Sequence, residues 1–314
     1  MSVTCPSRDQ QSYRHEAFLW AEPADFTAGL VPFLEEGLEA SEPTMVAVGP
    51  EHTDWLRDAL GRRAEKIRFV DMHQLGRNPA RIIPAWQQFL DESGGPHRPV
   101  RGIGEPIWPG RRAEELLECQ LHEALLNVAV DPDLPFWLIC PYDTSNLSHA
   151  VVEEAYRSHP VIVEAGTYQG STGYAGRAHV DSLFAAELGA PSTEVRTAHF
   201  GDHDVNRLLT YTRLEFYVTG LSASRADDLA YVVQRLALDS LHRGSGGGTV
   251  TIWSQPDSVV CEVADDLPVN DPLIGRRAPT GEAHDALWVA NQLCDLVQLR
   301  STPAGAAVRV HAWT

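Results

Sequence analysis

Residues 229–248, with the sequence LAYVVQRLALDSLHRGSGGG, decide how the second half of this chain folds. Their apolar side chains recur at close to helical spacing, which predicts an amphipathic helix. Ser222 is the expected N-cap, and Gly244 with the glycines at 246–248 ends the helix. A β-branched run at 249–253 follows at once and predicts a strand. A long helix that leads directly into a strand therefore organises this half of the chain.

The remaining elements of residues 194–314 surround this helix. Before it we expect a strand at 196–200 and a helix at 204–217. After it we expect strands at 249–254 and 258–263, a loop at 264–282, a helix at 283–294, and strands at 296–300 and 307–311. Helices on one face of a mixed sheet form an α/β sandwich.

The composition is that of a globular protein with two domains. The chain has 314 residues, of which 43% are hydrophobic and 22% are charged. No apolar run has the ~18 to 20 residues of a membrane span, and the polar N-terminus lacks the apolar core of a secretion signal. We therefore expect a cytoplasmic protein that does not enter a membrane. The five cysteines lack CxxC spacing, which argues against disulfides and against a zinc site.

The chain is strongly acidic, with a formal net charge of −18 at pH 7. Such a protein is repelled by phosphate backbones, which argues against direct binding to nucleic acid. The charge suits a protein partner with a basic surface, although acidic faces that only contact solvent are the commoner case.

The first half alternates strands with helices, beginning with a strand at 15–20. This order predicts an α/β domain whose mainly parallel sheet is covered on both faces. Residues 167–193 are rich in Gly, Ser and Tyr, which is typical of a linker. We therefore divide the chain into a first domain at 15–166, a linker at 167–193 and a second domain at 194–314.

The first domain lacks a phosphate-binding loop. Parallel sheets bind ligands beyond the carboxyl ends of their strands, and a P-loop needs GxxxxGK[ST] there. This chain has GPEHTDWL at 49–56, without the second glycine and the lysine. We therefore exclude nucleotide hydrolysis in this domain.

Polar residues of the first domain instead predict a small ligand pocket. Two of them follow predicted strands, and four lie on the predicted helix at 112–127. On that helix, residues that are four apart share a face. The predicted pocket residues are Glu105, Glu118, His122, Glu123, Asn127 and Asp143.

Two alternatives to this pocket stay open. Glu118 and His122 could form an exposed ion pair or make structural hydrogen bonds alone. A metal site needs a third ligand that the sequence does not identify, so we assign no metal. A haem or metal role for Cys119, His122 or Cys140 is the weaker alternative.

Four segments of the first domain resemble the MEDS sensory family. They are the strand that begins at His15, GEPIWPG at 104–110, ECQLHEALLN at 118–127 and LICPYD at 138–143. The resemblance implies a RecA/KaiC-like fold without a P-loop, and a role in sensing a small molecule or another signal.

The second domain resembles GHKL-type ATPases in the order helix, strand, strand, lid loop, helix and strand. The segments DDLPVNDPLIGRRAP at 265–279 and LWVANQLCDLVQLRS at 287–301 are similar to actinobacterial anti-sigma regulators that join a MEDS domain to a serine-kinase-like domain. The resemblance implies ATP and magnesium as cofactors, a sigma factor or an anti-anti-sigma protein as partner, and a homodimer.

Several positions that serve the nucleotide in that family carry other residues here. Arg235 stands at the acidic position, where a cation cannot act as a base. Asp239 stands where an asparagine holds magnesium, a role that a carboxylate can also fill. Asp265 matches the adenine-binding aspartate, but Leu267 replaces the glycine that lets the backbone approach the base.

The phosphate-binding motif has also changed, since His284 and Ala286 replace two glycines. Together the changes predict a pseudo-kinase without catalytic residues or cofactors. Such a chain would be a signal-responsive transcription regulator of the anti-sigma type that acts by protein–protein binding. One alternative is an active, divergent serine/threonine kinase that uses Asp239 and Asp265 with Mg-ATP. The other is a small-molecule sensor whose main site lies in the first domain.

Overall fold

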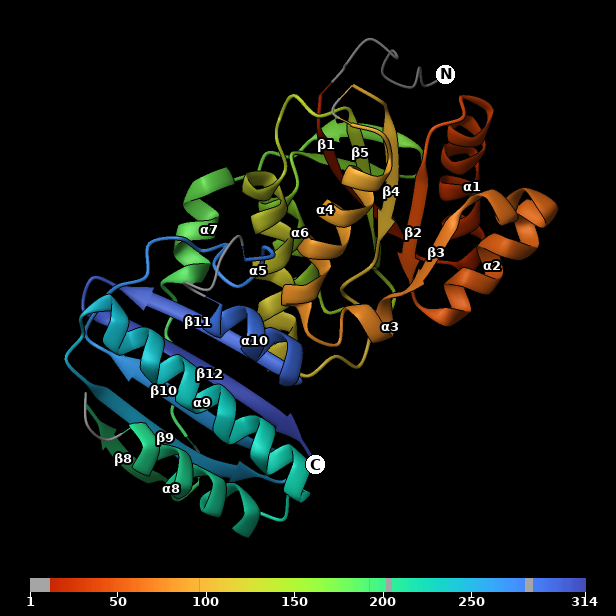
Figure 1. The fold of residues 1–314 in the computed structure, drawn as a ribbon. Helices are drawn as coiled ribbons and strands as arrows, with labels where there is room; N and C mark the ends of the chain where they lie inside the picture. The colour runs from red at the N-terminus through yellow and green to blue at the C-terminus, as the bar shows by residue number, and fades with distance from the viewer. Residues whose placement is uncertain (1–11, 96, 192, 202–204, 280–284) are drawn as a thin grey trace. The chain divides into compact units, whose positions relative to one another are not determined.

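The computed structural model describes residues 12–95, 97–191, 193–201, 205–279 and 285–314. These described residues form two compact units, which divide between Val180 and Asp181. Each unit has its own sheet, the first rich in parallel strands and the second antiparallel, with helices packed against it (Figure 1). The α/β class that the sequence predicts is thus confirmed.

The first unit is built on a sheet of seven strands in the order β3-β2-β4-β5-β1-β6-β7. Strands β1 to β6 pair in parallel, while β7 at the edge pairs antiparallel with β6. The strands are β1 (Arg14–Trp20), β2 (Thr44–Val48), β3 (Arg68–Asp71), β4 (Val100–Gly104), β5 (Phe136–Asp143), β6 (Val161–Glu164) and β7 (Thr167–Gly170).

Helices cover both faces of this sheet. Helices α1 (Pro23–Glu39) and α2 (Pro50–Leu60) pack on one face, and α4 (Ile82–Glu92), α5 (Ala113–Ala129) and α6 (His149–Ser158) pack on the other (Figure 1). Right-handed crossovers explain this division, because the chain moves from β1 through β2 to β3 toward one edge and then returns through β4 and β5 to β6. The shorter helical segments are η1 (Gly61–Lys66), α3 (Met72–Leu75), η2 (Pro79–Arg81) and α7 (Gly176–Phe184).

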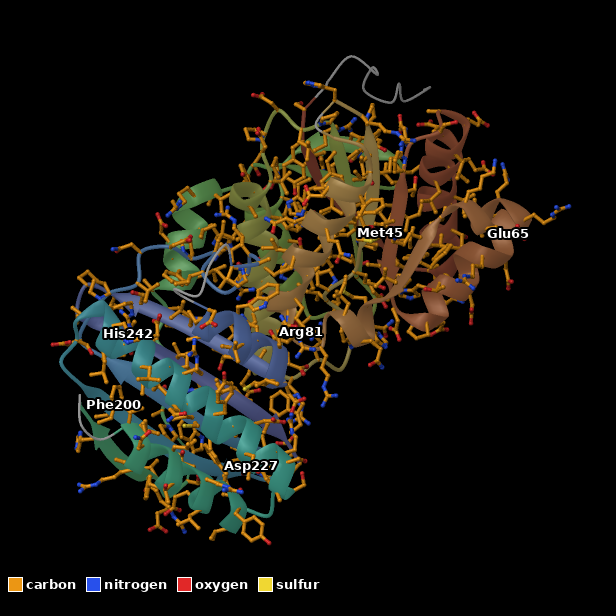
Figure 2. The ribbon with its side chains drawn as sticks, in the orientation of Figure 1. Met45, Glu65, Arg81, Phe200, Asp227 and His242 are labelled. Atoms are coloured by element: carbon orange, nitrogen blue, oxygen red, sulfur yellow. The ribbon has the colours of Figure 1, made fainter. Side chains whose placement is uncertain are left out.

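The buried strands of the first unit are nearly continuous apolar runs because both of their faces are covered. Strand β2 reads TMVAV and is buried throughout, with Met45 labelled in Figure 2. The core between the sheet and the first two helices contains the fully buried Phe26, Leu30 and Leu56. Burying each side chain of this size contributes about 1.5 to 3 kcal/mol.

The sequence PARIIPAWQQFLD at 79–91 predicts one helix with an internal proline, and the structure forms this helix in two parts. A 3-10 turn, η2, comes first, and Asn78 caps it by accepting a hydrogen bond from the N–H of Ala80 at 3.1 Å. Pro84 is the third residue of α4. The first four N–H groups of a helix have no partner within the helix, so this proline removes no hydrogen bond.

The predicted linker at 167–193 contains regular structure. Its first residues form β7, which extends the first sheet by pairing with β6. Helix α7 follows at Gly176–Phe184. Thr167 and Tyr168 are residue types that favour strands, which explains why the sheet continues past residue 166.

The second unit is built on a sheet of five strands in the order β11-β12-β10-β9-β8. All of its neighbouring strands pair antiparallel, in contrast to the mixed sheet that the sequence predicts. Tight hairpins join β9 to β10 and β11 to β12, and hairpins impose antiparallel pairing. The strands are β8 (Arg196–Phe200), β9 (Gly248–Gln255), β10 (Ser258–Asp265), β11 (Leu296–Thr302) and β12 (Gly305–Trp313).

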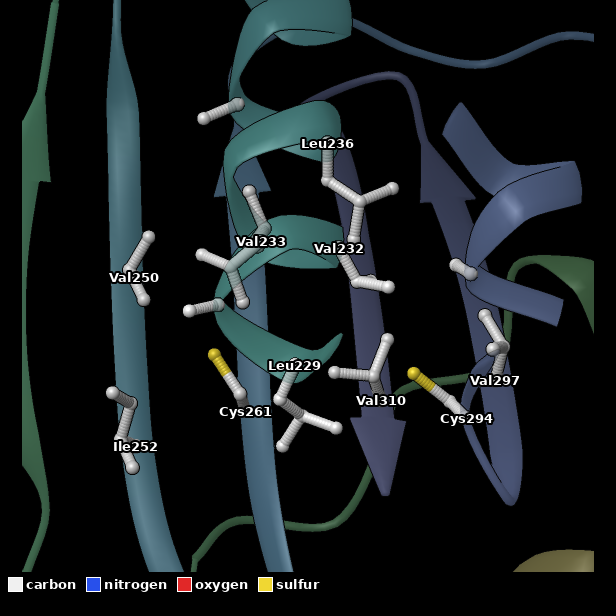
Figure 3. Packing of buried hydrophobic residues seen from close by; sticks show 14 of the residues in the cluster. Leu229, Val232, Val233, Leu236, Val250, Ile252, Cys261, Cys294, Val297 and Val310 are labelled. Atoms are coloured by element: carbon white, nitrogen blue, oxygen red, sulfur yellow. The ribbon is translucent and has the colours of Figure 1, made fainter. Parts of the chain in front are cut away.

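The predicted central helix of the second unit is α9 (Ala223–Arg243), which contacts β9, β10 and β12 between α8 (Val205–Val218) and α10 (Ala286–Leu293). Figure 3 shows Leu229, Val232 and Val233 of α9 directed at side chains of the sheet. Ser222 caps the helix by accepting from the N–H of Arg225 at 3.4 Å, and Gly244 ends it with a φ of 97°. The predicted face, N-cap and C-terminus of this helix are therefore confirmed.

No helix within the described residues is long and apolar enough to cross a membrane.

Candidate functional site

A pocket of about 670 Å³ lies at the carboxyl ends of the parallel strands in the first unit. Each of five strands contributes a lining residue at or just after its last residue. These are Trp20 from β1, Gly49 after β2, His73 after β3, Glu105 after β4 and Asp143 from β5. The neighbours β2 and β4 continue into α2 and α5 on opposite faces, and such a reversal opens a crevice at the strand ends.

A buried carboxylate and an imidazole form the polar centre of this pocket. Glu105 is 3% exposed, and its Oε2 lies 2.7 Å from Nδ1 of His52. The N–H of Gly49 donates to the same oxygen at 3.5 Å. Burial raises the pKa of Glu105. Burial alone would lower the pKa of His52, but the hydrogen bond and the charge of Glu105 outweigh it and raise that pKa.

Aromatic rings form the wall beside this polar pair. The ring of His52 lies 5.3 Å from that of Trp20 and 4.7 Å from that of Trp55, measured between centroids. The ring centroid of Trp108 lies 4.4 Å from that of His73, and the two rings are tilted by 40°. The guanidinium carbon of Arg111 lies 3.5 Å from the centroid of the Trp108 ring. The pocket thus combines an apolar wall with a few polar groups, as small-molecule sites do.

Asp143 organises the loop at the end of β5. One of its oxygens accepts from the N–H groups of Ser145 at 3.0 Å and Asn146 at 3.1 Å. The other accepts from the side-chain amide of Asn146 at 2.8 Å. These bonds hold a carboxylate at the pocket rim.

The structure divides the six predicted pocket residues between separate places. Glu105 and Asp143 line the pocket at the strand ends. Glu118, His122 and Glu123 lie on α5 and are at most 1% exposed, so the alternative of an exposed Glu118–His122 pair is wrong. Helix α5 packs against α4 and α6 as well as the sheet, which explains why its polar residues are covered.

Glu123 and the partly buried Asn127 belong to a second group near the start of β1, in which Glu123 itself is fully buried. Oε2 of Glu123 lies 3.0 Å from Nε2 of His15, 3.3 Å from Nε2 of His159 and 3.4 Å from Sγ of Cys140. Asn127 places its Oδ1 3.1 Å from Nδ1 of His15. The three partners of Glu123 come from β1, from β5 and from the residue after α6, while Asn127 lies on α5 with Glu123.

Burial and close contact shift the pKa values of this second group. Burial alone would raise the pKa of Glu123, but its close contacts with the imidazoles of His15 and His159 outweigh burial and hold that pKa well below its usual value. Burial, with His159 nearby, lowers the pKa of His15. Burial and Glu123 raise the pKa of Cys140 well above 9.0. These directions favour an ionised Glu123 carboxylate, a neutral imidazole at His15 and a neutral thiol at Cys140.

The sequence interpretation missed His15 and His159 as functional candidates. One signal was available, since His15 and Glu16 are ionisable residues at the start of the buried-type strand HEAFLW, where such residues are unusual. His159 follows α6 and gives no comparable signal, because only the fold brings it to β1.

In the second unit, ion pairs engage three of the six residues of the predicted nucleotide site, Arg235, Asp239 and Asp265. Arg235 pairs with Asp285, and Arg243 pairs with Asp239 at 3.2 Å and with Asp265 at 2.5 Å.

Asp265 also shapes the loop that follows it. It accepts from the N–H of Leu267 at 2.9 Å, which caps the loop. Ala286 is buried at the start of α10, and the prediction for His284 lies outside the described residues.

The first unit has the architecture of α/β domains that bind ligands at the carboxyl ends of their strands. Residues 14–160 match the MEDS family, the MEthanogen/methylotroph, DcmR Sensory domain. The chain therefore contains a MEDS domain, as its segments predict. No curated protein matches the chain.

Proposed function

We propose that this chain is a signal-responsive regulator whose MEDS domain binds a small molecule in the pocket at the strand ends. The observation that carries this proposal is the buried Glu105–His52 pair beside the ring of Trp55. The volume of about 670 Å³ lies within the range of 300 to 1,000 Å³ that is usual for small-molecule sites.

The lining of the pocket favours one class of ligand. Glu105, Asp143 and Glu51 bring carboxylates to it, so an anionic ligand is repelled. The indoles of Trp55 and Trp108 offer apolar surface and attract cations to their faces. A small amine, or an alcohol that donates a hydrogen bond, with a short apolar body fits this chemistry.

Fluorescence titration tests this proposal, because the tryptophans of the pocket report on a bound molecule. We expect n-butylamine and n-butanol to change the emission and butyrate, with the same carbon skeleton, to leave it unchanged. Glu105→Gln should weaken amine binding at least tenfold, whereas Glu65→Gln on the exposed surface should not. Equal responses to butyrate and butylamine would rule out the proposed ligand class.

The second unit, we infer, acts by binding a protein in the manner of anti-sigma regulators, with its nucleotide site degenerate. The ion pairs of Arg235 with Asp285 and of Arg243 with Asp265 support this inference. Arg243 also pairs with Asp239, so its cation lies against both carboxylates that a kinase would use, Asp239 for magnesium and Asp265 for adenine. The alternative is an active kinase that uses Asp239 and Asp265 with Mg-ATP.

Thermal unfolding with and without Mg-ATP separates these alternatives. A pseudo-kinase should show no shift at millimolar Mg-ATP, whereas ligand at 100 times its Kd stabilises a protein by about 2.7 kcal/mol. A shift that Asp265→Asn abolishes, together with phosphorylation of a partner, would instead establish the kinase.

An exposed apolar surface on α8 and α9 supports protein binding. Leu214 is 62%, Tyr217 63% and Val218 69% exposed, and Tyr231 lies beside the first two in a shallow groove. Apolar patches of this kind mark interaction sites. The partner that we propose is a sigma factor or an anti-anti-sigma protein.

Co-purification tests this surface. The double change Leu214→Asp with Tyr217→Asp should remove the bound sigma factor or anti-anti-sigma protein while the chain stays folded. Retention of that partner would show that this surface is not its binding site. Loss of a homodimer without loss of the partner would instead assign the surface to self-association.

A further inference from the structure

Four side chains with metal-ligating atoms meet inside the first unit, away from the residues that line the pocket. They are His15 on β1, Glu123 on α5, Cys140 on β5 and His159 at the end of α6. Their ligand atoms lie within 4.8 Å of one another, and each residue is at most 2% exposed. Four elements that are distant in sequence thus deliver two imidazoles, a carboxylate and a thiol to one buried point.

Four of the six distances between these ligand atoms match the edges of a tetrahedral metal site. Oε2 of Glu123 lies 3.0 Å from Nε2 of His15, 3.3 Å from Nε2 of His159 and 3.4 Å from Sγ of Cys140. The Cys140 sulfur lies 3.4 Å from Nε2 of His15. A tetrahedron with metal–nitrogen and metal–oxygen bonds of about 2.0 Å and a metal–sulfur bond of about 2.3 Å has edges of about 3.3 to 3.6 Å.

Hydrogen bonds outside this group determine which nitrogen of His15 faces it. Nδ2 of Asn127 donates to the carbonyl of Ser158 at 2.7 Å, which leaves Oδ1 of Asn127 as an acceptor toward His15 at 3.1 Å. Nδ1 of His15 must therefore carry the hydrogen. In the neutral ring, Nε2 then presents a lone pair to Glu123 and Cys140.

His159 is oriented in the same way by a backbone carbonyl. Its Nδ1 lies 2.9 Å from the carbonyl oxygen of Ala155, which can only accept. Nδ1 must therefore donate, and Nε2 of the neutral ring also points a lone pair at Glu123. Metal-ligating histidines are typically held like this, with the second ring nitrogen donating to a carbonyl or an amide oxygen.

Without a cation, these acceptors repel one another. Two ring lone pairs face one carboxylate oxygen at 3.0 and 3.3 Å, and the thiol of Cys140 supplies a single hydrogen. Protonating one imidazole leaves the other lone pair facing the carboxylate. Protonating both buries a net positive charge, which is costly.

Two buried polar atoms of this group also lack a hydrogen-bond partner. Within the described part of the chain, Oε1 of Glu123 and Nε2 of His159 are buried and have no hydrogen-bond partner. A divalent ion would engage these groups, and the thiolate and the carboxylate would neutralise its charge.

We propose that His15, Glu123, Cys140 and His159 bind a divalent transition-metal ion, and that zinc suits this ligand set best. On binding, the thiol of Cys140 loses its proton to solvent and its sulfur bonds to the metal, while both imidazoles bind through Nε2. Asn127 then acts as a positioning residue for His15. This site goes beyond the proposed ligand pocket and does not depend on it.

Cobalt and zinc loading of the full chain test this site. After removal of metal with a chelator, we expect one Co²⁺ per chain, with the intense visible bands of tetrahedral cobalt and a thiolate-to-cobalt charge-transfer band. X-ray absorption of the zinc form should show one sulfur at about 2.3 Å and three nitrogen or oxygen atoms at about 2.0 Å. Substoichiometric binding, or a metal without a sulfur neighbour, would overturn the proposal.

Two cysteine variants provide a matched comparison. Cys140→Ser should abolish the charge-transfer band and weaken cobalt binding by more than 100-fold. Cys119→Ser, which changes a buried thiol on α5 that donates to the carbonyl of Pro106, should retain both. Equal loss in the two variants would contradict the assignment. Should Cys140→Ser fail to fold, the stoichiometry and sulfur neighbour of the wild type still decide.

Asn127→Ala gives a milder test, because it removes no ligand. We expect metal affinity to fall by about 10- to 100-fold, as is usual when the partner of a ligating histidine is removed. The cobalt spectrum should keep its charge-transfer band. Unchanged affinity would contradict the positioning role and the tautomer of His15 on which the site rests.

Discussion

Glu105 and His52 show how one buried contact sets the chemistry of the pocket. The carboxylate is 3% exposed and the imidazole 16%, and both of their pKa values are raised. The pair therefore holds a proton at a pH where a free carboxyl and a free imidazole would have lost it. The stability that His52 contributes is fully present below pH 6.5 and is lost as the pH rises through its folded-state pKa.

A titration of His52 checks this coupling. In the wild type we expect the NMR midpoint of His52 to lie above 6.5, and in Glu105→Gln to fall, because the hydrogen bond and charge of Glu105 are lost and only Glu51 and Asp143 still oppose burial. The exposed change Glu65→Gln should leave the midpoint where it is. An identical midpoint in Glu105→Gln and the wild type would show that Glu105 does not control His52.

Arg243 illustrates a residue whose importance appears only in three dimensions. Besides its two ion pairs, it donates to the carbonyl of Leu267 at 3.4 Å. The sequence places it one helical turn from Asp239 but gives no reason to join it to Asp265. In the structure Asp265 both pairs with Arg243 and caps its own loop through the N–H of Leu267.

At the scale of elements, the apolar face of α9 packs on the sheet and forms the core of the second unit. Leu229 is fully buried in the core against the sheet, while Leu214 on the neighbouring α8 is 62% exposed. The two leucines have the same side chain on adjacent helices, and they differ in burial. Only the buried one should matter for stability.

We expect Leu229→Ala to lower the free energy of unfolding by about 2 to 5 kcal/mol, because it leaves a cavity in a close-packed core. Leu214→Ala should change it by less than about 0.5 kcal/mol. Urea unfolding of both variants measures this difference. Similar losses would mean that α8 is covered in solution, for example by a second copy of the chain.

At the scale of the whole molecule, the two units have separate hydrophobic cores. One cluster consists of residues up to Tyr168, and the other begins at Phe184. Neither cluster includes a residue of the other unit. Each unit is large enough to fold cooperatively on its own core.

Calorimetry of the full chain should therefore resolve two unfolding transitions. Leu229→Ala should lower the midpoint of the second unit's transition and leave that of the first unit unchanged. Zinc should raise only the midpoint of the first unit's transition. A single transition that moves as a whole with either change would show that the units unfold as one.

The sequence predicts the elements well and the site in part. The strand at 44–48, the helix around Leu229 and the strand at 161–164 are recognisable because hydrophobic periodicity is a local property. Glu105 and Asp143 could be placed at the pocket because parallel strands bring their carboxyl ends to one edge. The aromatic wall of Trp20, Trp55 and Trp108 could not be predicted, because its rings come from segments of the chain that only the fold brings together.

The sequence by itself determined the α/β class, the helix at 229–243 with its glycine end, and the MEDS resemblance, because each depends on residues that are close along the chain. Only the tertiary structure decided that His15, Cys140 and His159 surround Glu123, and that Arg243 reaches Asp265. These contacts depend on strand order, on register and on which face of a helix is buried. Long-range packing sets all three, and no local pattern of residues records them.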